Sequence, residues 1–168
     1  MSDDSTAVGA YNDKITVTPQ TSPAKQWWVG IDGKLTNTIL NTISRARIAA
    51  AESSMTKTTI TDRQTSLLNK LILYKTSKGN YGIMHVTEVH NTDPDGFGHI
   101  TFNYKTFNSN GTIKQSGNNE IVKGTFTFDL DEAINSDTNN DFFLENTGLT
   151  SSTRHFKPEN GAKFYVLP

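Results

Sequence analysis

The sequence predicts an α+β fold that is mostly antiparallel β, in which a meander forms a β-barrel or a two-layer β-sandwich with one flanking α-helix. Thr, Asn and Ser number 24, 16 and 13 of 168 residues, and they favour strands and the turns between them. From residue 67 onward, apolar and polar residues alternate with a period of two, which is typical of half-buried strands. One earlier segment repeats its apolar residues at intervals of three and four, which indicates a helix.

Residues 1–13 are acidic and polar, so we expect them to form a flexible tail in front of a single domain at residues 14–168. The total length matches one domain of roughly 100–200 residues. The tail has neither the basic start nor the apolar centre of a secretory signal peptide. No apolar run approaches the roughly 18 residues of a membrane-spanning helix. Localisation therefore stays open between the cytoplasm and release without a conventional signal.

The predicted helix runs from about residue 34 to residue 53. Three consecutive alanines at 49–51 support it, and so does the absence of Gly and Pro between residues 34 and 53. Its apolar residues are spaced by four, four, three and four positions, so they would line one face of the helix. These residues are Leu35, Ile39, Ile43, Ala46 and Ala50.

Residues 67–130 read as five strands joined by turns that contain Gly, Asn or Asp, which predicts an antiparallel meander. Each hairpin must keep one apolar face, because side chains alternate along a strand. Closing the second hairpin on this rule pairs Phe102 with Val86 and Tyr104 with Met84. All four side chains then face the core.

The same rule predicts the next two turns. The first pairs Thr106 with Ile113 on the core face. A two-residue turn at Gly117 and Asn118 then pairs Ile113 with Val122, and Gly in the first position is the type II′ pattern. A turn one residue longer would break the apolar face, so we expect two separate strands here.

The first strand of the meander is apolar on both sides. Leu71 and Leu73 face one way, while Ile72 and Tyr74 face the other. A strand of this kind is covered on both faces. We therefore expect the helix to pack over the outer side of this strand.

Beyond the meander, residues 142–145 and 162–167 read as two closing strands. The polar segment at residues 135–141 resembles the start of a calcium loop, because oxygen-bearing side chains recur at alternate positions. Asn140 stands where the loop needs Gly, and Asn146 stands where it needs a bidentate Glu. We therefore expect a solvated loop without a metal ion.

Four titratable residues gather in the second hairpin: His85, Glu88, His90 and His99. On a regular strand His85 faces away from Glu88 and His90, so the three cannot converge on one ion. His85 and His99 could share a face, but a third close ligand is missing. We expect an exposed polar sheet face, which also carries Asn103, and neither metal ligands nor catalytic residues.

Glu88 has two interpretations. Strand parity places it on the core face opposite Ile100, where it could line a ligand cavity together with Tyr104 and Gln115. A carboxylate in such a cavity would have a raised pKa. The interpretation that we favour is that Glu88 reaches solvent, because it lies two residues from the loop.

Trp27 and Trp28 form the other candidate for binding. In an extended segment one ring faces inward and the other outward, and an outward ring can stack on a sugar or anchor a partner protein. The alternative is that both rings are buried, one of them under the helix. The sequence leaves both possibilities open.

Several kinds of chemistry are excluded or disfavoured. The chain has no cysteine, which excludes disulfides, thiolate metal sites and a cysteine nucleophile. A net charge of -1 disfavours nucleic acid as a partner. There is no Gly-x-Ser-x-Gly motif and no glycine-rich phosphate loop. We predict no cofactor.

The function that we expect is a non-enzymatic binding module, lectin-like, with carbohydrate as the first ligand class to test and a protein partner as another. One alternative is a self-assembling structural subunit or a membrane-active, pore-forming toxin-like protein, either of them a homo-oligomer. The Ser/Thr-rich residues 53–66 could serve as its inserting segment, although a linker is the favoured interpretation. The other alternative is a small barrel enzyme with Glu88 in a cavity. The candidate ligand-binding residues are Trp27, Trp28, Glu88, His99, Asn103 and Tyr104.

Overall fold

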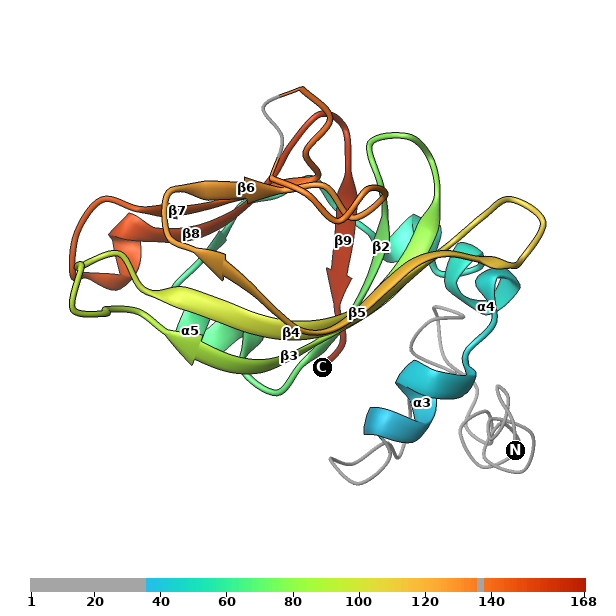
Figure 1. Cartoon of the computed structure of the whole chain (residues 1–168), viewed down its shortest axis with the longest axis horizontal. Helices are drawn as coiled ribbons and strands as arrows, with labels where there is room; N and C mark the ends of the chain where they lie inside the picture. The colour runs from blue at the N-terminus through green and yellow to red at the C-terminus, as the bar shows by residue number, and fades with distance from the viewer. Residues whose placement is uncertain (1–35, 136–137) are drawn as a thin grey trace.

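A computed structural model of the chain describes residues 36–135 and 138–168. The predicted tail at residues 1–13 and the two tryptophans lie outside these residues. The described part is mostly antiparallel β with a few short helices (Figure 1). Its strands form two separate sheets, which is the sandwich alternative and not a closed barrel. In this part of the chain, no helix is both long and apolar enough to cross a membrane.

The larger sheet has five antiparallel strands in the order β5-β4-β3-β2-β9. It contains most of the predicted meander, and the last strand of the chain pairs with β2 at one end. Its strands are β2 (Leu71–Lys75), β3 (Tyr81–His90), β4 (His99–Phe107), β5 (Ile113–Lys123) and β9 (Lys163–Val166).

The smaller sheet has four antiparallel strands in the order β1-β8-β7-β6. The sequence predicted β7 and placed β6 in one strand with the end of β5, but it missed β8, whose burial alternates only weakly. Its strands are β1 (Ile60–Thr61), β6 (Phe126–Phe128), β7 (Phe142–Asn146) and β8 (Arg154–Pro158).

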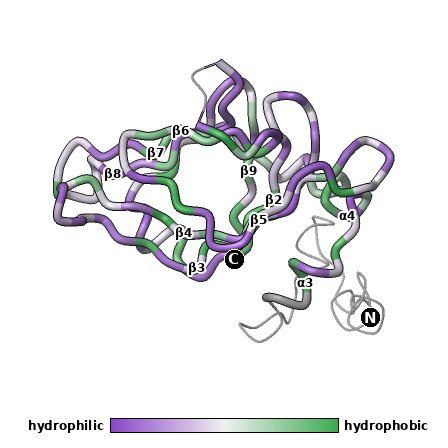
Figure 2. Tube along the Cα trace, in the orientation of Figure 1, coloured by the Kyte–Doolittle hydropathy of each residue, from purple (hydrophilic) through white to green (hydrophobic). Residues whose placement is uncertain are grey.

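An aromatic core lies between the two sheets. The rings of Phe142 and Phe156 stack with centroids 4.4 Å apart, and the edge of Phe102 meets Phe128 at 5.5 Å. Burying a side chain of this size stabilises the fold by about 1.5–3 kcal/mol. Hydrophobic and hydrophilic stretches are mixed along the strands of both sheets, as Figure 2 shows. The core therefore fills the space between the sheets and leaves the outer faces for other contacts.

The predicted helix at residues 34–53 is interrupted in the structure. It forms α3 (Thr36–Thr42), α4 (Arg45–Ala49) and the 3-10 turn η1 (Glu52–Ser54). The break has a local cause: Ser44 is extended, and its hydroxyl accepts a hydrogen bond from the Arg47 N–H as the N-cap of α4. The apolar spacing did not show that Ser44 would begin a new helix.

These helices pack on the outer face of β2 and β3, as the sequence predicted. Leu71 and Leu73 belong to a cluster with Ile43 and Ile48 of the helical segment. On the other side of β2, Tyr74 and its neighbours belong to the core between the sheets. The β2 strand is thus buried on both faces.

Glu52 joins the helical layer to the sheet. Its carboxylate accepts hydrogen bonds from the Tyr81 hydroxyl, from Lys75 Nζ at 3.0 Å and from Lys163 Nζ at 3.1 Å. The Tyr81 hydroxyl and the two ammonium groups lower the pKa of Glu52 to about 2. Three strands of the larger sheet are therefore tied to η1 by one side chain.

The predicted register is confirmed for the first half of the β3–β4 hairpin, where Met84 pairs with Tyr104 and Val86 pairs with Phe102. The register predicted for the following segment was wrong. Ile113 pairs with Phe107 instead of Thr106, and 54% of Ile113 is exposed. These pairings place Ile113 outside the core.

No turn occurs at Gly117 and Asn118, because β5 continues through both residues. Val122 pairs with Ile100 and not with Ile113. Close packing explains why position 117 is a glycine: a Cβ at Gly117 would lie 2.8 Å from the ring of Tyr104. A strand glycine can mark a close approach as well as a turn.

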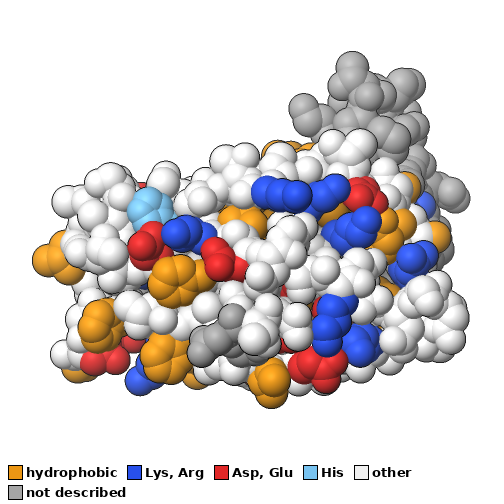
Figure 3. Space-filling model, turned by 90° about the horizontal axis from the view of Figure 1, so that it is seen from above, with side chains coloured by type: hydrophobic (Ala, Val, Ile, Leu, Met, Phe, Trp, Pro, Cys, Tyr) orange, Lys and Arg blue, Asp and Glu red, His pale blue; other side chains and the backbone are white. Residues whose placement is uncertain are grey.

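Residues 53–66 do not form a strand hairpin. After η1 the chain forms the short strand β1 and then α5 (Arg63–Leu67). Figure 3 shows one side of the molecule, on which hydrophobic side chains lie in separate groups among charged and polar ones. The exposed large hydrophobic residues of the described chain are Leu68, Phe97, Ile113, Ile121, Phe126, Ile134 and Leu149.

Candidate metal-binding site

The candidate site lies at the end of the β3–β4 hairpin, next to the loop that joins the two strands. The ladder is interrupted after Val86, and Thr87 is the extra residue of a β-bulge. Beyond the bulge, Glu88 pairs with Thr101 and His90 pairs with His99. Because a bulge shifts the alternation by one residue, Glu88 changes from the core face to the outer face.

The prediction that Glu88 lies on the core face opposite Ile100 was therefore wrong. Val89 occupies that place, and 52% of the Glu88 side chain is exposed. The favoured interpretation, that Glu88 reaches solvent, is confirmed by this exposure. A carboxylate at the surface cannot act inside a cavity, so we do not propose the barrel-enzyme alternative further.

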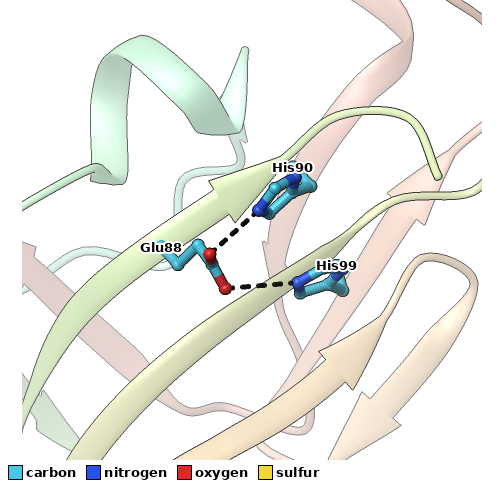
Figure 4. Close-up of side chains that lie close together, drawn as sticks. All are labelled: Glu88, His90 and His99. Atoms are coloured by element: carbon cyan, nitrogen blue, oxygen red, sulfur yellow. Dashed lines mark ion pairs between the residues drawn. The ribbon is translucent and has the colours of Figure 1, made fainter.

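The bulge brings Glu88, His90 and His99 together as a surface cluster, which Figure 4 shows. Glu88 Oε2 lies 3.1 Å from His90 Nε2, and Glu88 Oε1 lies 3.5 Å from His99 Nε2. The two imidazole rings stack with centroids 4.5 Å apart and planes inclined by 19°. The sequence analysis did not predict this group, because on a regular strand Glu88 and His90 would face away from His99.

The carboxylate of Glu88 is held by its neighbours. The Thr101 hydroxyl donates a hydrogen bond of 3.1 Å to Glu88 Oε1. His90, Thr101 and His99 lower the pKa of Glu88 by hydrogen bonding to the ionised form. The cluster therefore presents a charged oxygen between two ring nitrogens.

Asp93 orients one of the two imidazoles. Its Oδ2 lies 2.8 Å from His99 Nδ1, so the Nδ1–H can donate to the carboxylate while Nε2 points at Glu88. Histidines that bind metal ions are commonly held in this way by a carboxylate behind the ring. Only 19% of the His99 side chain and 17% of the Asp93 side chain are exposed, which restricts their movement.

The connecting loop is fixed to the rest of the molecule. The side-chain amide of Asn146, at the end of β7, donates to the backbone oxygens of Asn91 at 2.9 Å and of Phe97 at 2.8 Å. Gly98 has φ = 73°, and a Cβ there would collide with the backbone oxygen of His90. The loop thus holds Asp93 and His99 in one arrangement.

A surface depression of about 420 Å³ adjoins the cluster. It shares His99 and Asp93 with the site, and Ile121 of β5 provides apolar surface in it. The full lining consists of Asp93, Pro94, Asp95, His99, Ile121 and Lys123.

The structure separates the other candidate residues. Asn103 lies on the outer face, where its side-chain oxygen accepts a hydrogen bond from the Asn119 N–H at 2.8 Å. Tyr104 faces the core, where its ring packs against Phe102 and Phe128, and burial raises its pKa. Of the four candidates that the structure describes, only Glu88 and His99 therefore come together.

Sequence reasoning missed two members of this arrangement. The His85-x-x-Glu88-x-His90 string does signal His90, but regular strand parity places it on the face away from His99. Asp93 lies in a predicted turn, and no local pattern pairs it with His99. His85 stays outside the cluster and pairs with Asn103 in the ladder.

The fold and the site define a two-sheet antiparallel β protein with a surface cluster of two histidines and one glutamate. Comparison of the chain with protein-family models, with curated proteins and with solved structures finds no match.

Proposed function

We propose that this protein is a binding module that holds a divalent transition-metal ion of the zinc type at Glu88, His90 and His99. The observation that carries the proposal is the spacing of the ligand atoms. Ligands about 2.0–2.1 Å from a tetrahedral zinc ion lie roughly 3.3–3.5 Å apart. The two carboxylate oxygens of Glu88 lie 3.1 Å from His90 Nε2 and 3.5 Å from His99 Nε2, and one ligand atom of each residue lies within 4.8 Å of the other two. Small side-chain rotations would admit the ion.

The chemistry of the ligands supports the choice of metal. Neutral imidazole suits zinc, copper and nickel, whereas calcium and magnesium prefer ligands that are all oxygen. Two imidazoles and one carboxylate supply three ligands and leave a position open for water or for a donor from a second molecule. The depression beside His99 is where such a molecule would lie.

The test is calorimetric titration of Zn²⁺ into the full chain after treatment with a chelator. We expect His99→Ala and Glu88→Ala each to weaken binding at least tenfold. The matched control is His155→Ala, because His155 also faces a glutamate, with Nε2 3.9 Å from Glu145 Oε1, but lies on β8. Unchanged affinity in His99→Ala, or an equal loss in His155→Ala, would contradict the proposal.

Carbohydrate binding is the second candidate function, and it is the ligand class that the sequence suggested testing first. The observation that favours it is the depression, where the carboxylates of Asp93 and Asp95 border the apolar side chains of Pro94 and Ile121. Carboxylates accept hydrogen bonds from sugar hydroxyls, and apolar surface suits the face of a sugar ring. A glycan array probed with and without Zn²⁺ and, independently, titration of the tryptophan fluorescence with a panel of monosaccharides and disaccharides test it. Flat responses in both would exclude it.

A further inference from the structure

A second group of acidic side chains lies in the interior, on the segment between β6 and β7. This buried cluster consists of Asp129, Asp131 and Asp141, one oxygen of each lying within 4.8 Å of the others. The three residues are 1%, 1% and 0% exposed. Burying a carboxylate costs free energy unless hydrogen bonds or a cation compensate its charge. The groups that compensate the charge of this cluster therefore have to be identified.

Hydrogen bonds fix two of these carboxylates in place. Both oxygens of Asp141 accept backbone N–H groups, from Ser77 and from Leu130, each at 2.6 Å. Asp129 Oδ1 accepts the N–H groups of Asp131 at 2.8 Å and of Glu132 at 3.2 Å. These contacts orient the acids but bring no positive charge.

The third carboxylate is only half satisfied. Asp131 Oδ1 accepts a hydrogen bond of 2.8 Å from the side-chain amide of Asn80. Asp131 Oδ2 is buried and has no hydrogen-bond partner among the described residues. Buried polar atoms are almost always paired, so an exception requires an explanation such as a bound ion.

The lysines nearby do not supply the missing charge. Lys78 Nζ and Lys114 Nζ each lie 3.5 Å from Glu132 Oε2. None of the ion pairs that the structure describes reaches the three aspartates. Glu132, adjacent in sequence but 46% exposed at its side chain, thus takes the basic partners that the buried cluster lacks.

We propose that the buried cluster is a calcium site formed by Asp129, Asp131 and Asp141. A ligand set that is entirely oxygen suits a hard cation, and Ca²⁺ accepts the irregular geometry that three loop-borne carboxylates offer. The ion would give Asp131 Oδ2 its partner and offset the charge of the other two acids. This site is separate from the surface cluster and does not depend on the proposed zinc binding.

A calcium ion here would strengthen the contact between two chain segments. Ser77 and Asn80 belong to the β2–β3 turn, and their bonds to Asp141 and Asp131 join that turn to the segment between β6 and β7. An ion that binds only the folded state stabilises that state by mass action. We therefore expect calcium to act as a structural ion.

The test measures the thermal midpoint of the full chain in a chelator and in millimolar Ca²⁺, and the luminescence of Tb³⁺ sensitised by nearby tyrosines. We expect Ca²⁺ to raise the midpoint by several degrees and to displace Tb³⁺. Asp131→Asn, which keeps the shape and the bond to Asn80, should bind Ca²⁺ at least tenfold more weakly. The matched control, Glu132→Gln, changes an exposed acid of the same segment and should respond as the wild type does.

His99→Ala should also keep the full calcium response, which separates this proposal from the zinc proposal. A midpoint that ignores millimolar Ca²⁺ and rises only as the pH falls would overturn the proposal, because a proton would then neutralise the cluster. An undiminished response in Asp131→Asn would overturn it as well. The titrations of the wild type decide the question even if Asp131→Asn does not fold.

Discussion

The surface cluster and the buried cluster have the same size and opposite surroundings. Each places three ligand atoms within 4.8 Å of one another. Hydrogen-bond donors in a solvent-exposed position lower the pKa of Glu88, whereas burial raises the pKa of Asp141 to about 7. The comparison shows that the neighbours and the solvent of a carboxylate, more than its own chemistry, decide whether it carries charge.

Burial should also decide how strongly each cluster affects stability. Replacing Asp141 by Ala leaves the buried N–H of Leu130 and the partly buried N–H of Ser77 without an acceptor. We expect a loss of about 3 kcal/mol in the free energy of unfolding, measured by urea denaturation at pH 7 in a chelator. Glu88→Ala, at an exposed site, should cost less than about 0.5 kcal/mol. Equal costs would remove the distinction between the two clusters.

The raised pKa of Asp141 predicts a pH dependence in the metal-free protein. The folded value of about 7 lies above the ordinary 3.8, so folding favours the protonated form. This stabilisation is complete below about pH 4 and is lost as the pH rises through 7. We expect the free energy of unfolding to fall by up to about 1.4 kcal/mol per pH unit between pH 5 and pH 7.

The control for this prediction is Asp141→Asn, which keeps the shape of the side chain but has no carboxyl group to protonate. The difference between wild type and variant isolates the part of the slope due to residue 141. Burial is the main cause of the raised pKa of Asp141, and the nearby carboxylates of Asp131 and Asp129 raise it further. A wild-type slope equal to that of the variant would show that Asp141 stays ionised throughout.

Asp93 offers a smaller effect at the surface cluster. Asp93→Asn keeps an oxygen near His99 Nδ1 but removes the negative charge that holds the ring. We expect zinc binding to weaken about tenfold with little change in stability. The control, Asp95→Asn, lies in the same loop and caps the Phe97 N–H at 3.1 Å, and it should keep the wild-type affinity.

The features that follow from residue periodicity could be predicted from the sequence. The antiparallel fold, the pairing of Val86 with Phe102 and the helical layer over Leu71 all depend on alternation or helical spacing. The positions at which a helix breaks or a strand departs from regular alternation could not be predicted in the same way. Ser44 starts a new helix through one hydrogen bond, and Gly117 is required by the ring of Tyr104, which is distant in sequence.

The two clusters show the same limit. Asp129 and Asp131 lie at the end of the predicted meander, and Asp141 ends the polar segment at residues 135–141, but only the folded chain brings the three together. The expectation of a solvated loop at residues 135–141 also fails at its end, where Asn140 and Asp141 are buried. Side chains joined by tertiary contacts leave no spacing rule in the sequence.

The smallest expected effect concerns Thr87, which directly precedes Glu88 on β3. It is the extra residue of the bulge, so its deletion should leave a regular ladder in which Glu88 still pairs with Thr101 and His90 with His99. Zinc affinity should therefore stay within about threefold of the wild type, with a stability loss of about 1 kcal/mol.

Thr87→Ala is the matched control, because it removes the hydroxyl bond to the Thr101 backbone oxygen but keeps the chain length. Calorimetry gives the affinity, and cross-strand NMR contacts between Val89 and Ile100 report the register. A tenfold loss of affinity in the deletion variant alone would show that the bulge shapes the site as well as setting its face. Glu88 leaves the core face when the alternation of side chains shifts by one residue. The bulge at Thr87 causes such a shift, and so does deletion of Thr87.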